Sequence, residues 1–139
     1  MILRHTTLIS LLREISCEDA LDGKYHKRAK DIGHVSFELN PQNDYLSNNL
    51  YLLNKRGNID DYFYLEFDGE RLEADGYKII DKINGIRMTK LEIKITLPEM
   101  SEDQYHGIGE YRFIEGKIPL IYLTDDSRER LNVFLQTLK

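Results

Sequence analysis

The sequence begins MILRHTTLISLLREIS, residues 1–16, and this stretch carries the strongest local pattern of the chain. Residues 1–5 are short and partly apolar, which is compatible with a β-strand. A hydroxyl of Thr6 or Thr7 can accept a hydrogen bond from the first turn of a helix. Apolar residues then recur at helical spacing, at Leu8, Leu11, Leu12 and Ile15. The stretch therefore predicts a strand followed at once by an amphipathic helix over 7–15.

Downstream of this unit the sequence favours short strands over helices. Alternation of apolar and polar residues predicts strands at 34–39 and 91–97, and an aromatic run predicts one at 62–67. Shorter strands are predicted at 77–80, 110–114 and 118–123, with loops at 17–32 and 98–109 and a last helix from near Ser127. Since strands and helices do not alternate regularly, a doubly wound parallel sheet is disfavoured. We predict an α+β domain with mixed or antiparallel strands.

Composition narrows the class of protein without naming a function. The chain has 139 residues and a mass of 16.4 kDa, so we expect a single compact domain over 1–139. Its 24 acidic and 19 basic residues give a net charge of −5, which gives no general attraction to phosphate backbones. Cys17 has no cysteine to pair with, and no secretory signal is visible, so a cytoplasmic location is expected. No membrane span, metal-ligand spacing or phosphate-binding loop is recognised.

Three short segments carry residues capable of chemistry. They are Arg4-His5-Thr6-Thr7, then Gly33-His34-Val35-Ser36-Phe37, and Gly109-Glu110-Tyr111-Arg112-Phe113. Each also has a purely structural explanation. His5 could bond a neighbouring carbonyl, Thr7 could cap a helix, and Ser36 could be a tolerated core hydroxyl. Only the order of the three segments along the chain points beyond these structural explanations.

That order resembles the ADP-ribosyltransferase superfamily, especially the DNA-modifying ADP-ribosyltransferase toxins of bacterial toxin–antitoxin pairs and small ADP-ribosyltransferase-like proteins of bacteria and phages. Those proteins begin with a strand carrying His-x-Thr, continue into a leucine-rich helix and later place a Val-Ser/Pro-Phe strand. Near the C-terminus they carry one glutamate at the head of a strand and then an Ile/Val-Pro-Leu step. The matching stretches here are 5–7, 8–15, 34–37 and 110–120.

The resemblance implies an ADP-ribosyltransferase-like split sheet, with a helix after the first strand and a C-terminal helix. It also implies NAD as co-substrate and no metal. Loss of nicotinamide leaves an oxocarbenium-like ribose, which a carboxylate stabilises, and Glu110 is the candidate. His5 would bond the ribose of the adenosine half, and Thr7 would contact the cofactor from the helix start, with Thr6 also against the cofactor. Backbone groups of the first strand would hold the nicotinamide amide.

The second wall of this site would come from Ser36 and Phe37, with Phe37 or Tyr45 stacking on the nicotinamide ring. Lys27 or Arg28 would neutralise the pyrophosphate. The loop 98–109 takes the place where these enzymes present the acceptor, through Glu102, Gln104, Tyr105 and His106. His106 or Glu102 could deprotonate that acceptor.

Three departures from the family pattern bear on these expectations. The family helix commonly ends in a glycine turn, whereas residues 16–19 read Ser-Cys-Glu-Asp here. Transferases that modify arginine carry a second acid two positions before the catalytic one, and Ile108 stands there, so arginine is disfavoured as acceptor. Arg4 could replace His5 as first-strand ligand. Successive strand residues point to opposite faces, so only one of the two can serve, and His5 gives the fuller match.

The sequence thus supports two main hypotheses. The first is an NAD-dependent mono-ADP-ribosyltransferase (a glycosyltransferase) acting on a nucleic acid or protein, in toxin–antitoxin or phage–host conflict, with an antitoxin or inhibitor as partner. The second is a non-catalytic α+β binding protein that serves as an immunity, inhibitor or nucleotide-sensing module. A metal-dependent nuclease is weaker, because its acid pairs, Asp60-Asp61, Glu66/Asp68 and Asp125-Asp126, lie at expected strand ends and turns.

Overall fold

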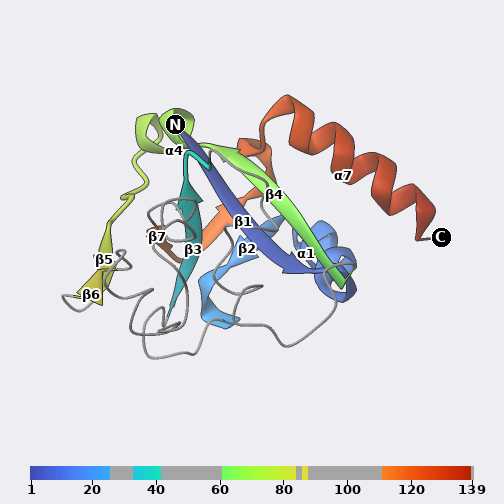
Figure 1. Cartoon of the computed structure of the whole chain (residues 1–139), viewed down its shortest axis with the longest axis horizontal. Coiled ribbons are helices and arrows are strands. Elements are labelled where there is room, and N and C mark those ends of the chain that lie inside the picture. Colours follow the sequence, from blue (N-terminus) through green and yellow to red (C-terminus); the bar gives the residue numbers. More distant parts are fainter. Residues whose placement is uncertain (26–32, 42–60, 84–85, 88–110, 139) are drawn as a thin grey trace, which may run out of the picture.

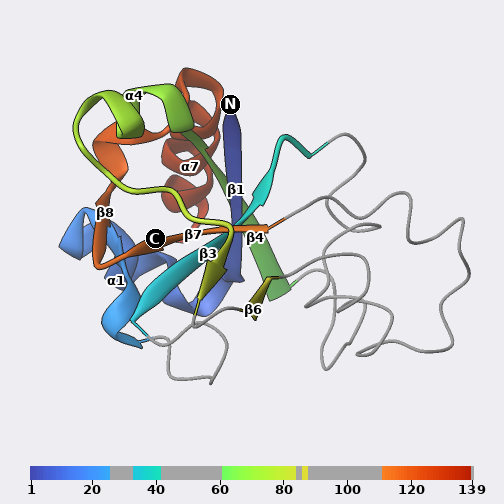
Figure 2. The same cartoon turned by 90° about the vertical axis from the view of Figure 1, so that its left-hand side faces the viewer.

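The computed structural model describes residues 1–25, 33–41, 61–83, 86–87 and 111–138 (Figures 1 and 2). The strands are β1 Ile2–Leu8, β2 Ala20–Asp22, β3 His34–Leu39, β4 Tyr62–Asp68, β5 Lys82–Ile83, β6 Ile86–Arg87, β7 Tyr111–Glu115 and β8 Lys117–Pro119. The α-helices are α1 Leu12–Glu18, α4 Gly69–Ala74 and α7 Asp125–Thr137, and short 3-10 turns cover Ile9–Leu11, Gly23–Tyr25 and Leu120–Tyr122.

Four antiparallel strands form the main sheet, in the order β4-β1-β3-β7. A smaller antiparallel pair, β2-β8, lies beside it, and β5-β6 forms a third pair. Figure 2 shows α1, α4 and α7 together on one side of β1. Each of these helices sends one leucine into the same core as the sheet, namely Leu12, Leu72 and Leu131. The described residues therefore share one hydrophobic core.

Alternation along β4 explains how this core is built. Phe63, Leu65 and Phe67 are buried, and they pair across the sheet with Thr7, His5 and Leu3 of β1. Because strand residues alternate between faces, these six side chains share one side of the sheet. Phe37 of β3 joins them through an edge-to-face contact with Phe67, whose ring centroid is 5.6 Å away.

The free edge of β4 is closed by the segment that leads into α7. The backbone N–H of Thr124 donates to the carbonyl of Glu66 at 2.9 Å, and the N–H of Glu66 donates to the hydroxyl of Ser127 at 2.9 Å. Arg130 donates to the carbonyl of Tyr64 at 2.6 Å. An open strand edge would be a template for pairing with other chains, and these three bonds occupy it.

The predicted strand-to-helix unit at the N-terminus is present, but its boundary was wrong. Thr6 and Thr7 lie within β1, opposite Tyr64 and Phe63, and neither caps a helix. The α-helix begins only at Leu12, after a 3-10 turn. Threonine is β-branched and packs well in a sheet, so pairing with the aromatic residues of β4 overrides its capping tendency.

The end of α1 explains the missing glycine turn. Asp19 follows the helix with φ 57° and ψ 30°, in the left-handed conformation that usually selects glycine. Aspartate is among the few other residues that tolerate this region. The chain then enters β2, a strand inside the stretch that we expected to be a loop.

The other predicted elements agree in part. Strands at 34–39 and 62–67 are confirmed, and the last helix begins two residues early, with Thr124 as its cap. A helix over 69–74, capped by Asp68, was not predicted. The strand expected at 77–80 is reduced to one bridge between Ile80 and Phe113, and 118–123 forms β8 followed by a 3-10 turn. The strand at 91–97 and the loop at 98–109 lie outside the described residues.

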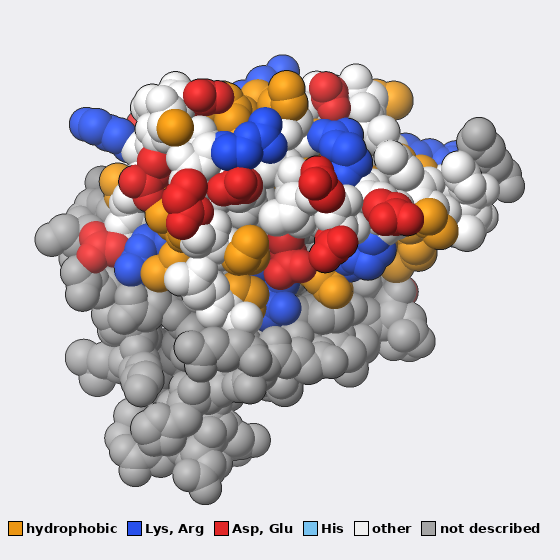
Figure 3. Space-filling view, turned by 90° about the horizontal axis from the view of Figure 1, so that it is seen from above, with side chains coloured by type: hydrophobic (Ala, Val, Ile, Leu, Met, Phe, Trp, Pro, Cys, Tyr) orange, Lys and Arg blue, Asp and Glu red, His pale blue; other side chains and the backbone are white. Residues whose placement is uncertain are grey.

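None of the helices that the structure describes is both long and apolar enough to cross a membrane. The face that carries α4 and α7 shows acidic and basic side chains interspersed among its described residues (Figure 3). This part of the surface therefore has no field of a single sign.

Candidate functional site

The two halves of the main sheet are joined at only a few residues. β1 pairs with β4 over seven residues and β3 pairs with β7 over five, but β1 and β3 pair only at Leu3–Leu39 and Arg4–Glu38. Beyond Arg4 and Glu38 the strands diverge, and Figure 1 shows them opening into a V from the N-terminal end of β1. The sheet is therefore split, as we predicted.

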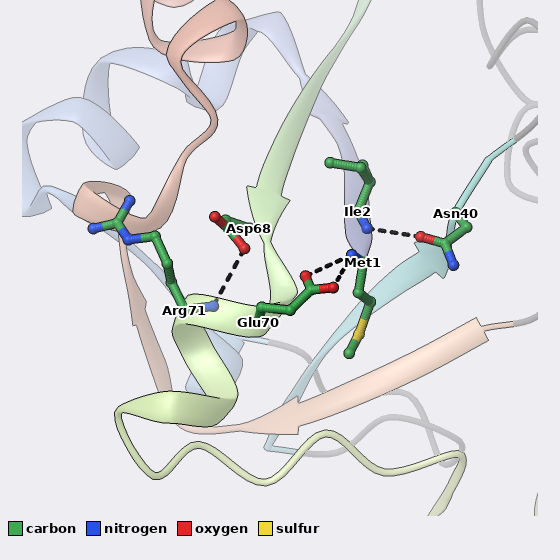
Figure 4. A network of polar contacts seen from close by, with 6 residues as sticks. All are labelled: Met1, Ile2, Asn40, Asp68, Glu70 and Arg71. Carbon is green, nitrogen blue, oxygen red and sulfur yellow. Dashed lines mark hydrogen bonds and ion pairs between the residues drawn. The ribbon is translucent and has the colours of Figure 1, made fainter.

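The closed end of this V is held by the N-terminus (Figure 4). Asn40 donates its backbone N–H to the carbonyl of Ile2 at 2.8 Å and accepts the Ile2 N–H on its side chain at 2.7 Å. The Met1 ammonium binds the carboxylate of Glu70, and the Gly69 N–H donates to the Met1 carbonyl at 2.8 Å. The hydrogen bond from that ammonium holds the pKa of Glu70 below its ordinary value.

A buried ion pair marks the last joint before the strands part. Arg4 Nη2 lies 3.3 Å from Glu38 Oε2, and the two side chains are 6% and 2% exposed. The Arg4 guanidinium also lies 5.5 Å from the ring centroid of Tyr64, on the neighbouring strand. Nothing in the sequence marks Glu38, because a glutamate in an alternating strand is normally on the solvent side.

His5 is the first residue of β1 beyond its ladder with β3, and its side chain contacts β3 instead. Its Nδ1 lies 2.8 Å from the carbonyl oxygen of Ser36, and its ring meets Phe37 edge to face at a centroid distance of 5.8 Å. A carbonyl oxygen only accepts hydrogen bonds, so Nδ1 carries the proton, and in the neutral ring Nε2 has the lone pair. In its neutral form the imidazole is therefore expected in the Nδ1–H tautomer, with Nε2 as the acceptor nitrogen.

Arg4 and His5, the two candidate ligands of the first strand, lie on opposite faces of the sheet. Arg4 shares a face with Glu38 and Tyr64, whereas His5 shares the opposite face with Phe37 and Leu65. The Arg4 guanidinium is held in a buried ion pair with Glu38. The choice of His5 as the first-strand ligand stays a prediction.

Other predicted site residues in the described part differ in how open they are. Thr7 is buried in β1, two residues beyond His5 on the same face, so it does not act from a helix start as we expected. Ser36 and Thr6 are half-buried. Phe37 is only 1% exposed and packs on Phe67 as well as on His5. In this structure its ring supports His5 from within the core, and its stacking on nicotinamide stays a prediction.

The remaining predicted site residues lie outside the described part of the chain. They are Arg28, Tyr45, Glu102, Gln104, Tyr105, His106 and Glu110. Glu110 directly precedes Tyr111, the first residue of β7, and Tyr111 pairs with Glu38 of β3.

The structure resembles two solved structures of one protein. They are those of Thermus sp. 2.9 DarT in complex with carba-NAD+ and in complex with NAD+. Each aligns with a TM-score of 0.60 at 13% sequence identity, covering 98% of this chain and 89% or 88% of DarT. The chain has an ADP-ribosyltransferase-like fold.

This similarity is one of fold, and it confirms the α+β architecture and split sheet predicted from the sequence. No protein-family model matches the sequence, and no curated protein matches it significantly. The match to DarT extends over nearly the whole chain.

Three of the acids considered for a nuclease, namely Asp68, Asp125 and Asp126, lie at helix starts. Asp68 accepts the N–H of Arg71 and caps α4, while Asp125 and Asp126 lie in the first turn of α7. Within the described ranges no three histidine, cysteine or carboxylate side chains gather as a metal site. Carboxylates at helix starts are stabilised by the helix dipole, which accounts for these acids.

Proposed function

We propose that this protein is an NAD-dependent mono-ADP-ribosyltransferase that modifies a nucleic acid or protein. The observation that carries the proposal is the position of His5. It lies where the β1–β3 ladder ends, with Nδ1 on the Ser36 carbonyl, on a fold similar to DarT structures that hold NAD+ and carba-NAD+. Ordered hydrogen-bonding groups at the opening of a split sheet suit a ligand that enters between the two halves.

In this proposal His5 binds a ribose of NAD. The Nε2 lone pair accepts a hydrogen bond from a ribose hydroxyl, while Nδ1–H stays on the Ser36 carbonyl. Thr6 and Thr7 continue β1 along the same opening, and backbone groups of β1 hold the nicotinamide amide. Arg28 neutralises the pyrophosphate, and the ring of Tyr45 stacks on nicotinamide.

Glu110 supplies the charge that the reaction needs. The glycosidic bond between the ribose C1′ and the nicotinamide nitrogen breaks, and nicotinamide leaves neutral with the electron pair. The carboxylate of Glu110 stabilises the oxocarbenium-like ribose and holds its 2′-hydroxyl. A nucleophilic oxygen or nitrogen of the acceptor then bonds to C1′, and its proton passes to His106 or Glu102.

The acceptor is a macromolecule presented by the loop 98–109, with Gln104 and Tyr105 as contacts. Ile108 disfavours arginine as the acceptor group. We place the reaction in toxin–antitoxin or phage–host conflict, where an antitoxin or inhibitor would control it. This context follows from the family resemblance.

The test is incubation of the purified protein with NAD labelled on its adenosine half and a cell lysate. We expect label on protein or nucleic acid, and we expect His5→Ala and Glu110→Gln to reduce labelling at least about a hundredfold. The matched control is Glu129→Gln, on the exposed side of α7. Full labelling by the folded Glu110→Gln variant would exclude the mechanism.

A second candidate function rests on the burial of His5 and Phe37, which are 9% and 1% exposed. Close packing at this point favours a non-catalytic nucleotide-sensing, inhibitor or immunity module with the same fold. Calorimetry with NAD and with carba-NAD separates a transferase from an inhibitor or immunity module, and the labelling assay separates it from a nucleotide sensor, which would bind NAD without transferring ADP-ribose. A transferase binds both ligands, and its affinity falls in His5→Ala, whereas an interaction module gives no heat with either.

A further inference from the structure

The last residue pair of the β1–β3 ladder before the strands part, Arg4 and Glu38, also forms a buried ion pair. Arg4 and Glu38 are paired residues of β1 and β3, and their side chains meet at 3.3 Å on one face of the sheet. On the opposite face, the next residue of β1 is His5, whose ring reaches the carbonyl of Ser36. Ser36 precedes Glu38 by two residues on the same strand, so one short segment of β3 holds both contacts.

The position of His5 depends on how far apart the strands are at this point. A shift of β3 away from β1 by a fraction of an ångström would lengthen the 2.8 Å contact between Nδ1 and the Ser36 oxygen. Hydrogen bonds weaken steeply when the donor–acceptor distance lengthens or the bond angle bends. The ion pair restrains that distance, because both charged groups are almost fully withdrawn from water and each is bound to the other strand.

We infer that the Arg4–Glu38 pair is a positioning device, which sets where the split begins and thereby holds His5 in its Nδ1–H tautomer. Arg4 and Glu38 touch neither the proposed cofactor nor the acceptor. They act through His5 and the Ser36 carbonyl. The consequence for NAD rests on the proposed function, whereas the effect on the His5 ring does not.

The test uses the double substitution Arg4→Met with Glu38→Leu, which removes both charges together and avoids leaving one buried alone. The readout is NMR of the imidazole nitrogens, since a fixed neutral tautomer gives two separate nitrogen signals and exchanging tautomers give averaged ones. We expect the two His5 signals in the wild type and averaged signals in the double variant. We also expect KM for NAD to rise about tenfold with a smaller change in kcat.

The matched control is Asp22→Asn, which breaks the ion pair that Asp22 makes with Lys24 at 3.5 Å in a different part of the fold. The His5 signals of this variant should equal those of the wild type. A folded double variant with unchanged His5 signals would overturn the inference. If the double variant does not fold, Glu38→Gln is measured in its place and should give averaged His5 signals. The single variant Arg4→Lys, which keeps the charge, should keep the fixed tautomer.

The outcome separates this inference from the proposed function. Averaged His5 signals in the double variant support the positioning role even if the wild type fails to turn over NAD, in which case only the proposed function fails. Unchanged signals overturn the positioning role even if the wild type is an active transferase. No activity measurement is needed for that decision.

Discussion

The Nδ1 atom of His5 lies 2.8 Å from the carbonyl oxygen of Ser36, at the first position where β1 and β3 no longer form a ladder. A side chain thus replaces the backbone donor that a continuous sheet would supply. This arrangement satisfies the Ser36 carbonyl, which would otherwise lose its hydrogen bond at the split. It also orients the one ionisable ring that β1 contributes.

Removing one member of the Arg4–Glu38 pair should cost more stability than removing both. We expect Glu38→Ala to lower the free energy of unfolding by about 3–5 kcal/mol, because it leaves the Arg4 charge buried without this partner. The double variant Arg4→Met with Glu38→Leu should stay within about 2 kcal/mol of the wild type. Urea denaturation measures both, and equal losses in the two variants would argue against a buried charge pair.

The junction of Gly23, Gly33 and Gly116 should not tolerate a side chain at Gly23. A Cβ there would lie 2.2 Å from the carbonyl oxygen of Gly33, and both glycines are held by backbone hydrogen bonds to Gly116. Gly23→Ala should therefore destabilise the fold by about 2–3 kcal/mol, as overpacking against backbone does.

The control for this substitution is Gly33→Asn. Gly33 has φ +74° but open space around its Cβ position. Asparagine tolerates this conformation, so we expect a loss of no more than about 1 kcal/mol. Thermal denaturation followed by circular dichroism compares the two, and a Gly23→Ala variant as stable as Gly33→Asn contradicts the prediction.

Ser127→Ala should weaken the closure of the β4 edge. The buried Ser127 hydroxyl accepts the N–H of Glu66 at 2.9 Å, and alanine leaves that N–H without this acceptor. We expect a loss of about 1–3 kcal/mol in the free energy of unfolding. Ser10→Ala, at an exposed position, should change it by less than about 0.5 kcal/mol. The idea fails if the two substitutions have the same effect in urea denaturation.

The Tyr122–Asp75 hydrogen bond should make stability fall at alkaline pH. The hydroxyl of Tyr122 donates to Asp75 Oδ2 at 2.5 Å, and this bond raises the pKa of Tyr122 to about 12. Since the folded pKa lies above the unfolded one, the stabilisation is complete below about pH 10. It is lost as the pH rises from there towards the folded value.

Tyr122→Phe is the matched variant for this prediction. It keeps the ring that packs edge to face on Tyr77 at 5.4 Å but removes the ionising hydroxyl. The free energy of unfolding of the wild type should decline across this alkaline range more steeply than that of the variant. Parallel curves from urea denaturation at each pH would show that Tyr122 does not cause the decline.

Parts of the fold could be predicted because local pattern and tertiary pairing agree there. The strands at 34–39 and 62–67 alternate in sequence, and apart from Glu38 and Tyr62 their buried residues lie on the side that the alternation predicts. The extension of β1 could not be predicted in this way. Thr6 and Thr7 suit a helix cap and a strand equally, and only their pairing with β4 decides between them.

The candidate site shows the same limit. His5 was selected as a candidate because a family pattern marks it. Alternation alone predicted that His5 and Arg4 lie on opposite faces of the sheet. Glu38 was missed because its burial depends on pairing with Arg4, which lies 34 residues earlier in the chain, and no local rule connects the two. The contact between Arg130 and Tyr64 was missed for the same reason. The Arg130 guanidinium comes to 3.6 Å from the centroid of the Tyr64 ring only when α7 packs beside β4.

The hydrogen bonds that α7 and the residues before it make to β4 have a practical consequence for engineering the chain. A shortened protein lacking residues 124–138 would present the backbone groups of Tyr64 and Glu66 to other molecules. Such a truncation should precipitate or form oligomers by strand addition. Affinity handles at this end therefore belong after an intact helix.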